Sequence, residues 1–118
     1  YFKEMMDSKS CISPFGYGEI SLRDFDIFLC GSILLKPSMS HLRTWPDFYQ
    51  SNITYLKFKW DASDLKKKIR LIKDSSKFQE IAKNGQNKFL KYTYGVEACN
   101  LFAQRFRNII EKKTQDEI

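Results

Sequence analysis

The chain of 118 residues has few of the side chains that build common catalytic and metal centres. Its single histidine, His41, would have to serve any catalytic triad or histidine-based metal site. No serine lies in a GxSxG elbow, and carboxylates do not cluster with His41 at metal-ligand spacing. We therefore expect no metal site, and any chemistry at this chain is expected to be independent of metal.

Cysteine is scarce and long apolar runs are absent. Cys11, Cys30 and Cys99 are far apart and lack CxxC or Cys/His spacing, so we expect buried, reduced thiols and a cytoplasmic location. No run approaches the roughly 20 apolar residues of a membrane span, and Lys3 and Glu4 interrupt the start where a signal peptide would be apolar. The sequence predicts a soluble domain that is a piece of a longer protein.

Positive charge is in excess, with a formal net charge of +6. This balance favours an anionic partner, and it is compatible with peripheral association with an acidic membrane. Basic residues gather on a predicted helix over residues 64–73, but its apolar residues form one core stripe instead of the interleaved aromatics of a nucleic-acid site. We therefore interpret the patch as a solvated face and expect no nucleic acid partner. The patch consists of Lys66, Lys67, Lys68, Arg70 and Lys73.

The order of patterns predicts a single α/β domain over residues 1–112, followed by a polar tail over 113–118. Apolar runs at "SILLKP" and "ITYLKFKW" indicate strands, the first of them buried on both faces as in a parallel sheet. Helices are expected over 2–7, 64–73, 76–91 and 95–112. A further helix is expected from the glycine turn to Cys30, with Gly31 just beyond its end. Cys11 and Ile12 are expected to form a short buried strand. Strand, helix, strand, strand and helices are typical of a small parallel sheet.

Charged residues line one side of the predicted helix in "GYGEISLRDFDIFLCG". Glu19, Arg23 and Asp26 follow at spacings of four and three, which places them together at 3.6 residues per turn. The opposite, core-facing side is expected to consist of Leu22, Phe25, Phe28 and Leu29.

A phosphate site is one interpretation of this segment. The turn at Gly16 and Gly18 opens a helix whose first N–H groups, with Ser21, suit a phosphate, and Arg23 offers a fork for a diphosphate. Glu19 and Asp26 are acceptors for sugar hydroxyls, so the parts outline a site for a nucleotide diphosphate carrying a sugar. The alternative is an ordinary set of surface ion pairs, each worth about 0.2–0.5 kcal/mol.

The long polar loop over residues 38–52 also offers ligand contacts. Ser38, Ser40 and His41 are its candidates, because loops of this length in small domains often serve a function. The alternative is a loop fixed to the core by Trp45 and Phe48.

Much of the chain, from about residue 11 to 92, resembles a known family. The segments "SPFGYGEISLRDFDIFLCGSILLKPSMSH", "ITYLKFKWDASDLKKKI" and "FQEIAKNGQNKFLKY" are similar to the carboxyl-terminal, donor-binding half of GT-B glycosyltransferases, especially exostosin-like and group 1 sugar transferases. The family pattern is close to G-(W/Y)-G-E-(V/I)-S-x-R-x-(F/Y)-E, although here Glu19 and Asp26 are separated by six residues where many members have seven.

The resemblance implies a partial Rossmann-like, three-layer domain and a function. Asp26, five positions before Gly31, would contact the nucleotide ribose, whereas Glu19 and Arg23 would act on the sugar and diphosphate as the catalytic pair. The whole enzyme would transfer a sugar from its nucleotide diphosphate donor to a glycan held by an amino-terminal half, with no further cofactor. A noncatalytic basic module that binds nucleic acid or a protein is the alternative.

Overall fold

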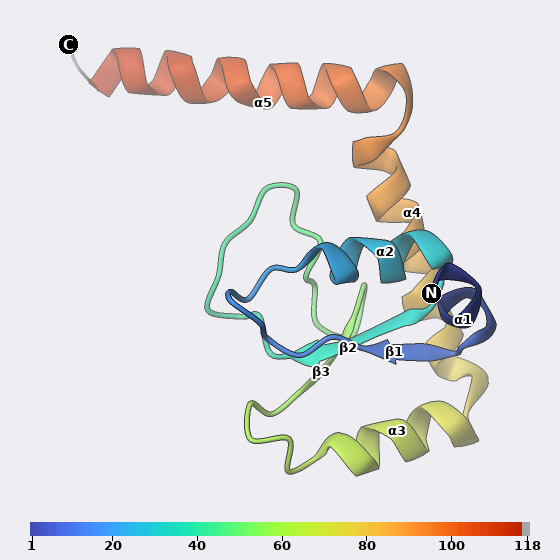
Figure 1. Cartoon of the computed structure of the whole chain (residues 1–118). Coiled ribbons are helices and arrows are strands. Elements are labelled where there is room, and N and C mark those ends of the chain that lie inside the picture. Colours follow the sequence, from blue (N-terminus) through green and yellow to red (C-terminus); the bar gives the residue numbers. More distant parts are fainter. Residues whose placement is uncertain (117–118) are drawn as a thin grey trace.

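The computed structural model describes the backbone of residues 1–116 and the side chains of residues 1–112. This part is mixed α/β (Figure 1). Its elements are α1 (Phe2–Asp7), β1 (Ser10–Ile12), α2 (Leu22–Cys30), β2 (Ile33–Pro37), β3 (Leu56–Phe58), α3 (Leu65–Asp74), the 3-10 turn η1 (Ser76–Phe78), α4 (Gln79–Thr93) and α5 (Gly95–Asp116). Helix α5 continues past residue 112, so residues 113–116 of the expected tail are helical, whereas residues 117–118 lie outside the described part.

The three strands form one parallel sheet in the order β1-β2-β3, which confirms the predicted parallel sheet. The register places Cys11 opposite Leu34, and Leu35 opposite Leu56. Because the strands are parallel, all three carboxyl ends lie at the same edge of the sheet. The loops that follow the strands therefore meet at that edge.

Two apolar clusters cover the two faces of the sheet, because successive side chains of β2 point to opposite faces. Leu34 packs with Ile27 and Phe28 of α2 in one cluster. Ile33 and Leu35 pack in the other, which is completed by Leu56, Phe58, Ile72, Ile81 and Ala82 from β3, α3 and α4. Figure 1 shows α2 and α3 on opposite sides of the strands. The whole of β2 is buried, as predicted.

The core-facing side of α2 differs from the expected one. Phe28 is buried and Phe25 is partly buried, but Leu22 and Leu29 are 81% and 47% exposed, so the prediction was wrong for these two leucines. The helix begins at Leu22, after the N-cap Ser21, and turns Asp24, Ile27 and Phe28 inward. Glu19 lies in the preceding turn and is not part of the helix.

Other expectations concerned the last helix and the thiols. Residues 95–112 are helical as predicted, yet the apolar residues on α5 are largely exposed, among them Val96, Phe102 and Phe106. Figure 1 shows α5 extending away from the sheet.

The three cysteines are free, but Cys11 and Cys30 are only partly buried and Cys99 is exposed, so the expected burial was wrong.

The loop over residues 38–52 is anchored by its aromatic residues. Phe48 is buried in the α2-side cluster, while Trp45 contacts Tyr92 of α4 and Phe102 of α5 at ring-centroid distances of 5.6 and 5.8 Å. The alternative prediction, a loop fixed to the core by Trp45 and Phe48, is therefore correct for the second half of this loop. No helix in the described range is long and apolar enough to cross a bilayer.

Gly85 allows α4 to pass close to the rest of the domain. A Cβ atom there would lie 2.8 Å from both the Phe28 ring and the Thr54 carbonyl oxygen. Alanine normally favours a helix over glycine by about 1 kcal/mol, yet overpacking costs about 1–3 kcal/mol. The close contact is therefore expected to decide the effect of a substitution.

We expect Gly85→Ala to lower the free energy of unfolding by up to about 2 kcal/mol, measured by urea denaturation. The matched control is Gly16→Ala, whose Cβ would meet nothing within 4 Å and which is expected to change stability by less than about 0.5 kcal/mol. A gain of stability in Gly85→Ala would contradict the close packing.

Candidate functional site

Three rings meet at the carboxyl edge of the sheet, one from each loop that follows a strand. Trp60, after β3, contacts Phe15, after β1, and His41, after β2, at centroid distances of 5.4 and 5.1 Å. The Trp60 Nε1–H donates a hydrogen bond of 2.9 Å to the Ser38 carbonyl oxygen, which fixes the indole. Trp60 itself is 62% exposed. The strand ends thus carry a partly exposed aromatic surface, which we call the edge cluster: Phe15, His41 and Trp60.

Glu19 and His41 form the polar part of this site. The His41 Nε2 and Glu19 Oε1 atoms are 3.3 Å apart, and both side chains are partly exposed. The pKa of the Glu19 carboxyl lies below its ordinary value, first because its own backbone N–H donates to it, and further because His41 donates to it. Glu19 is therefore held as an anion beside an imidazole, and two of the predicted site residues are in contact.

The serines of the second loop lie next to the edge cluster. The hydroxyl oxygens of Ser38 and Ser40 are 3.1 Å apart, and Ser40 is exposed. Their backbone position is fixed by Tyr55, whose hydroxyl accepts the N–H of Met39 at 3.0 Å. Ser40 and His41, which were predicted together, therefore project from one tethered turn.

A buried ion pair lies beneath the site. Lys36 Nζ is 3.1 and 3.2 Å from the two carboxylate oxygens of Asp24, and both side chains are fully buried. Ser13 donates to the same carboxylate at 2.5 Å and Tyr49 at 2.7 Å. Burial and the hydrogen bond to Asp24 raise the pKa of the Tyr49 hydroxyl far above its ordinary value.

The same carboxylate fixes the start of α2. The Ser21 N–H donates to Asp24 at 3.2 Å, and the Ser21 hydroxyl accepts the Arg23 N–H at 3.2 Å. The chain's own oxygens therefore occupy N–H groups at this helix start that a phosphate was expected to bind. Lys36 Nζ also lies 5.2 Å from the Phe15 ring centroid, so the pair supports the edge cluster directly.

Asp24 and Lys36 were not among the predicted site residues. The signal that could have identified them is a charge inside an apolar run: Lys36 in "SILLKP" and Asp24 on a helix with buried neighbours. A charged residue in a fully buried strand requires a partner. Asp24 and Asp26, two residues apart on a helix, do not face each other.

The remaining predicted residues lie at different places. Gly16 and Gly18 form an exposed turn in which the Gly16 N–H donates to the Gly18 carbonyl at 3.2 Å. Arg23 is exposed on the first turn of α2, and Asp26 accepts a hydrogen bond of 3.0 Å from Tyr1. Glu19 and Asp26 thus engage different parts of the chain.

The basic patch lies on α3, where Lys68 is half-buried and the others are exposed. Among the described residues, no group of three or more His, Cys, Asp or Glu side chains is arranged to hold a metal.

We expect Lys36→Met to lower the free energy of unfolding by about 3–5 kcal/mol, because it leaves the Asp24 carboxylate buried without its counter-charge. Chemical denaturation would measure the loss. Lys57→Met is the matched control, since Lys57 is the neighbour of Lys36 across the ladder but is exposed. An equal loss in both variants would contradict the ion-pair argument.

We expect an NMR titration to find the pKa of the Glu19 carboxyl below the ordinary glutamate value. In His41→Ala this pKa should rise yet remain low, because the largest cause, the backbone hydrogen bond, persists. In the wild type, the stabilisation contributed by the ionised Glu19 carboxyl is fully present above the ordinary glutamate pKa. It is lost as the pH falls through the lowered pKa of Glu19. An unchanged Glu19 pKa in His41→Ala would contradict the contact.

Comparison with known proteins adds no assignment. No family model matches this sequence, and no curated protein is detectably similar to it. The similarity to GT-B glycosyltransferases therefore stays a prediction, and the site is described by its own geometry.

Proposed function

We propose that the chain is the donor-binding part of a GT-B glycosyltransferase, with a partial Rossmann-like fold, that acts on a nucleotide diphosphate sugar in the cytoplasm. The observation that carries the proposal is the Glu19–His41 pair, which lies beside Trp60 at the carboxyl edge of a parallel sheet. Open α/β sheets bind their ligands outside the carboxyl ends of the strands. The three free cysteines fit a reducing compartment.

Each group of the edge offers one part of a donor site. The exposed Trp60 indole suits stacking against a base or a sugar ring. The Glu19 carboxylate accepts hydrogen bonds from sugar hydroxyls, and an imidazole such as His41 can donate to a phosphate oxygen. Ser40 adds a hydroxyl from the same turn as His41.

The diphosphate in this proposal lies toward Arg23 and His41. The backbone N–H groups of Ser21 and Arg23 already have acceptors within the chain. In this proposal the side chains of Arg23 and His41 therefore contact the phosphate oxygens. Asp26 is bonded to Tyr1 and is left out of the donor contacts.

The proposed mechanism is electrostatic. As the bond between the sugar and the diphosphate breaks, Arg23 and His41 stabilise the charge that develops on the leaving diphosphate. Glu19 orients the sugar. The acceptor hydroxyl, held by the amino-terminal half of the enzyme, forms the new bond and gives its proton to a base on that half.

We expect calorimetric titration of this chain with uridine and guanosine diphosphates to detect binding of one of them without added metal. His41→Ala and Arg23→Ala should each weaken that binding by about fivefold or more, because each removes a contact to a charged group. Lys66→Ala, on the exposed side of α3, is the control and should bind normally.

Two results would contradict the proposal. One is the absence of binding by either diphosphate at millimolar concentration. The other is binding that Lys66→Ala weakens as much as His41→Ala does, since this would indicate attraction by net charge alone.

A further inference from the structure

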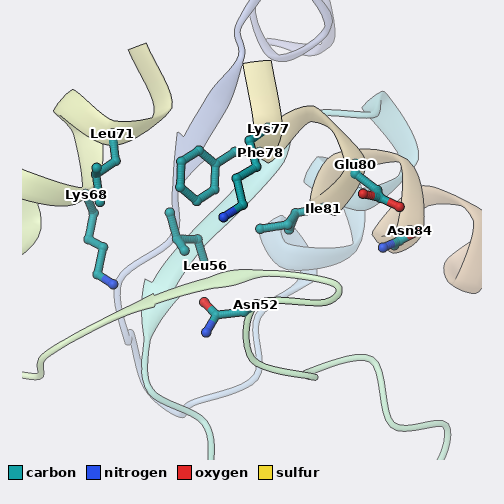
Figure 2. A pocket seen from close by; sticks show the side chains of 9 residues that line it. All are labelled: Asn52, Leu56, Lys68, Leu71, Lys77, Phe78, Glu80, Ile81 and Asn84. Atoms are coloured by element: carbon teal, nitrogen blue, oxygen red, sulfur yellow. The ribbon is translucent and has the colours of Figure 1, made fainter. Parts of the chain in front are cut away.

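A second cavity lies between α3, η1, α4 and the start of β3, away from the Glu19–His41 pair. Its volume is about 390 Å³, within the range of small-molecule sites. Its apolar lining includes Leu56, Phe78 and Ile81, of which Leu56 and Ile81 are almost fully buried. Figure 2 shows these side chains grouped in the middle of the pocket. The cavity thus offers a compact apolar surface.

Two lysines from different elements reach the same cavity. Lys68 extends from α3 and Lys77 from η1, and Figure 2 shows them on opposite sides of Leu56, with Lys77 extending toward it. The part of the chain that the structure describes provides neither ammonium group with an ion pair or a hydrogen bond to another side chain. Lys68 is half-buried and Lys77 is exposed. Cations beside an apolar surface favour an anionic group that enters with an apolar body.

The other end of the cavity has a different character. Glu80 and Asn84 of α4 lie together on the Ile81 side (Figure 2). The Glu80 carboxylate repels a second negative charge at that end. The arrangement therefore favours a ligand that is anionic at one end only.

We propose that this cavity binds a small organic acid with one carboxylate and a compact apolar body. The carboxylate lies between Lys68 and Lys77, and the apolar body covers Leu56, Phe78 and Ile81. The site is independent of the proposed sugar donor: none of the residues that line it is among the predicted donor contacts. Of the two lysines, Lys77 gives the cleaner test, because Lys68 also lines a smaller pocket with Ser38 and Lys59.

The test uses three probes that share one ring: phenylacetate, its neutral isostere phenylacetamide, and 1,4-phenylenediacetate, which carries a second carboxylate at the far end. Binding is followed by the shifts of the Leu56 and Ile81 backbone amides in ¹H–¹⁵N NMR spectra. Phenylacetate is expected to bind about threefold or more tightly than phenylacetamide, since a partly exposed charge contact contributes up to about fivefold in affinity. 1,4-Phenylenediacetate should bind more weakly than phenylacetate, and this difference should disappear in Glu80→Gln.

Lys77→Gln should weaken phenylacetate binding about threefold and leave phenylacetamide binding unchanged. Lys66→Gln, a lysine on the exposed side of α3, is the matched control and should bind phenylacetate like the wild type. Absence of shifts at Leu56 and Ile81 with 10 mM phenylacetate, on the order of the weakest useful affinities, would overturn the proposal. Equal binding of phenylacetate and its amide, or equal losses in Lys77→Gln and Lys66→Gln, would also overturn it.

Discussion

The buried ion pair between Asp24 and Lys36 is the interaction on which the carboxyl edge of the sheet depends. One carboxylate receives hydrogen bonds from Ser13 after β1, from the backbone of Ser21 at the start of α2, from Lys36 at the end of β2 and from Tyr49 in the following loop. Two charges without water are tolerated only when their remaining hydrogen-bonding capacity is also satisfied. The backbone segments that surround the pair are therefore held in one arrangement, and the candidate site is built on them.

The candidate site is connected to this buried ion pair by a chain of side-chain contacts. Lys36 lies against the Phe15 ring, Phe15 packs against Trp60, and Trp60 contacts His41, which pairs with Glu19. Phe15, Trp60 and His41 lie in loops that follow three different strands, and a parallel sheet brings those loops to one edge. A rigid floor with a partly exposed polar pair is the kind of support that a binding site requires. The cavity beside α3 and α4 differs from this site, because it combines an apolar wall with Lys68 and Lys77, for which the described residues provide no ion pair.

Sequence patterns were most reliable where burial is uniform. The run at "SILLKP" is a buried parallel strand, and Gly31 ends α2 in the left-handed region at φ 75°, as its position predicted. Periodicity failed for Leu22 and Leu29, because counting only apolar residues ignores the inward turn of Asp24. Cys99 was expected to be buried, whereas α5 leaves Cys99 and the nearby Phe102 exposed in the described structure. Helical spacing shows that a stripe exists and does not show what covers it.

For the candidate site, the sequence by itself determined the chemistry that is present: one histidine, a glutamate after a glycine turn, serines in a long loop and an excess of lysine. It also determined the succession of strands and helices, because local periodicity and glycine positions depend on neighbours along the chain. Only the tertiary structure decided that Glu19 meets His41 while Asp26 turns to Tyr1, and that Lys36 meets Asp24. These pairings join residues 12 to 25 positions apart. The parallel sheet brings the loops of Glu19 and His41 to one edge and sets Lys36 beside the start of α2, whereas Tyr1 meets Asp26 because α1 packs against α2.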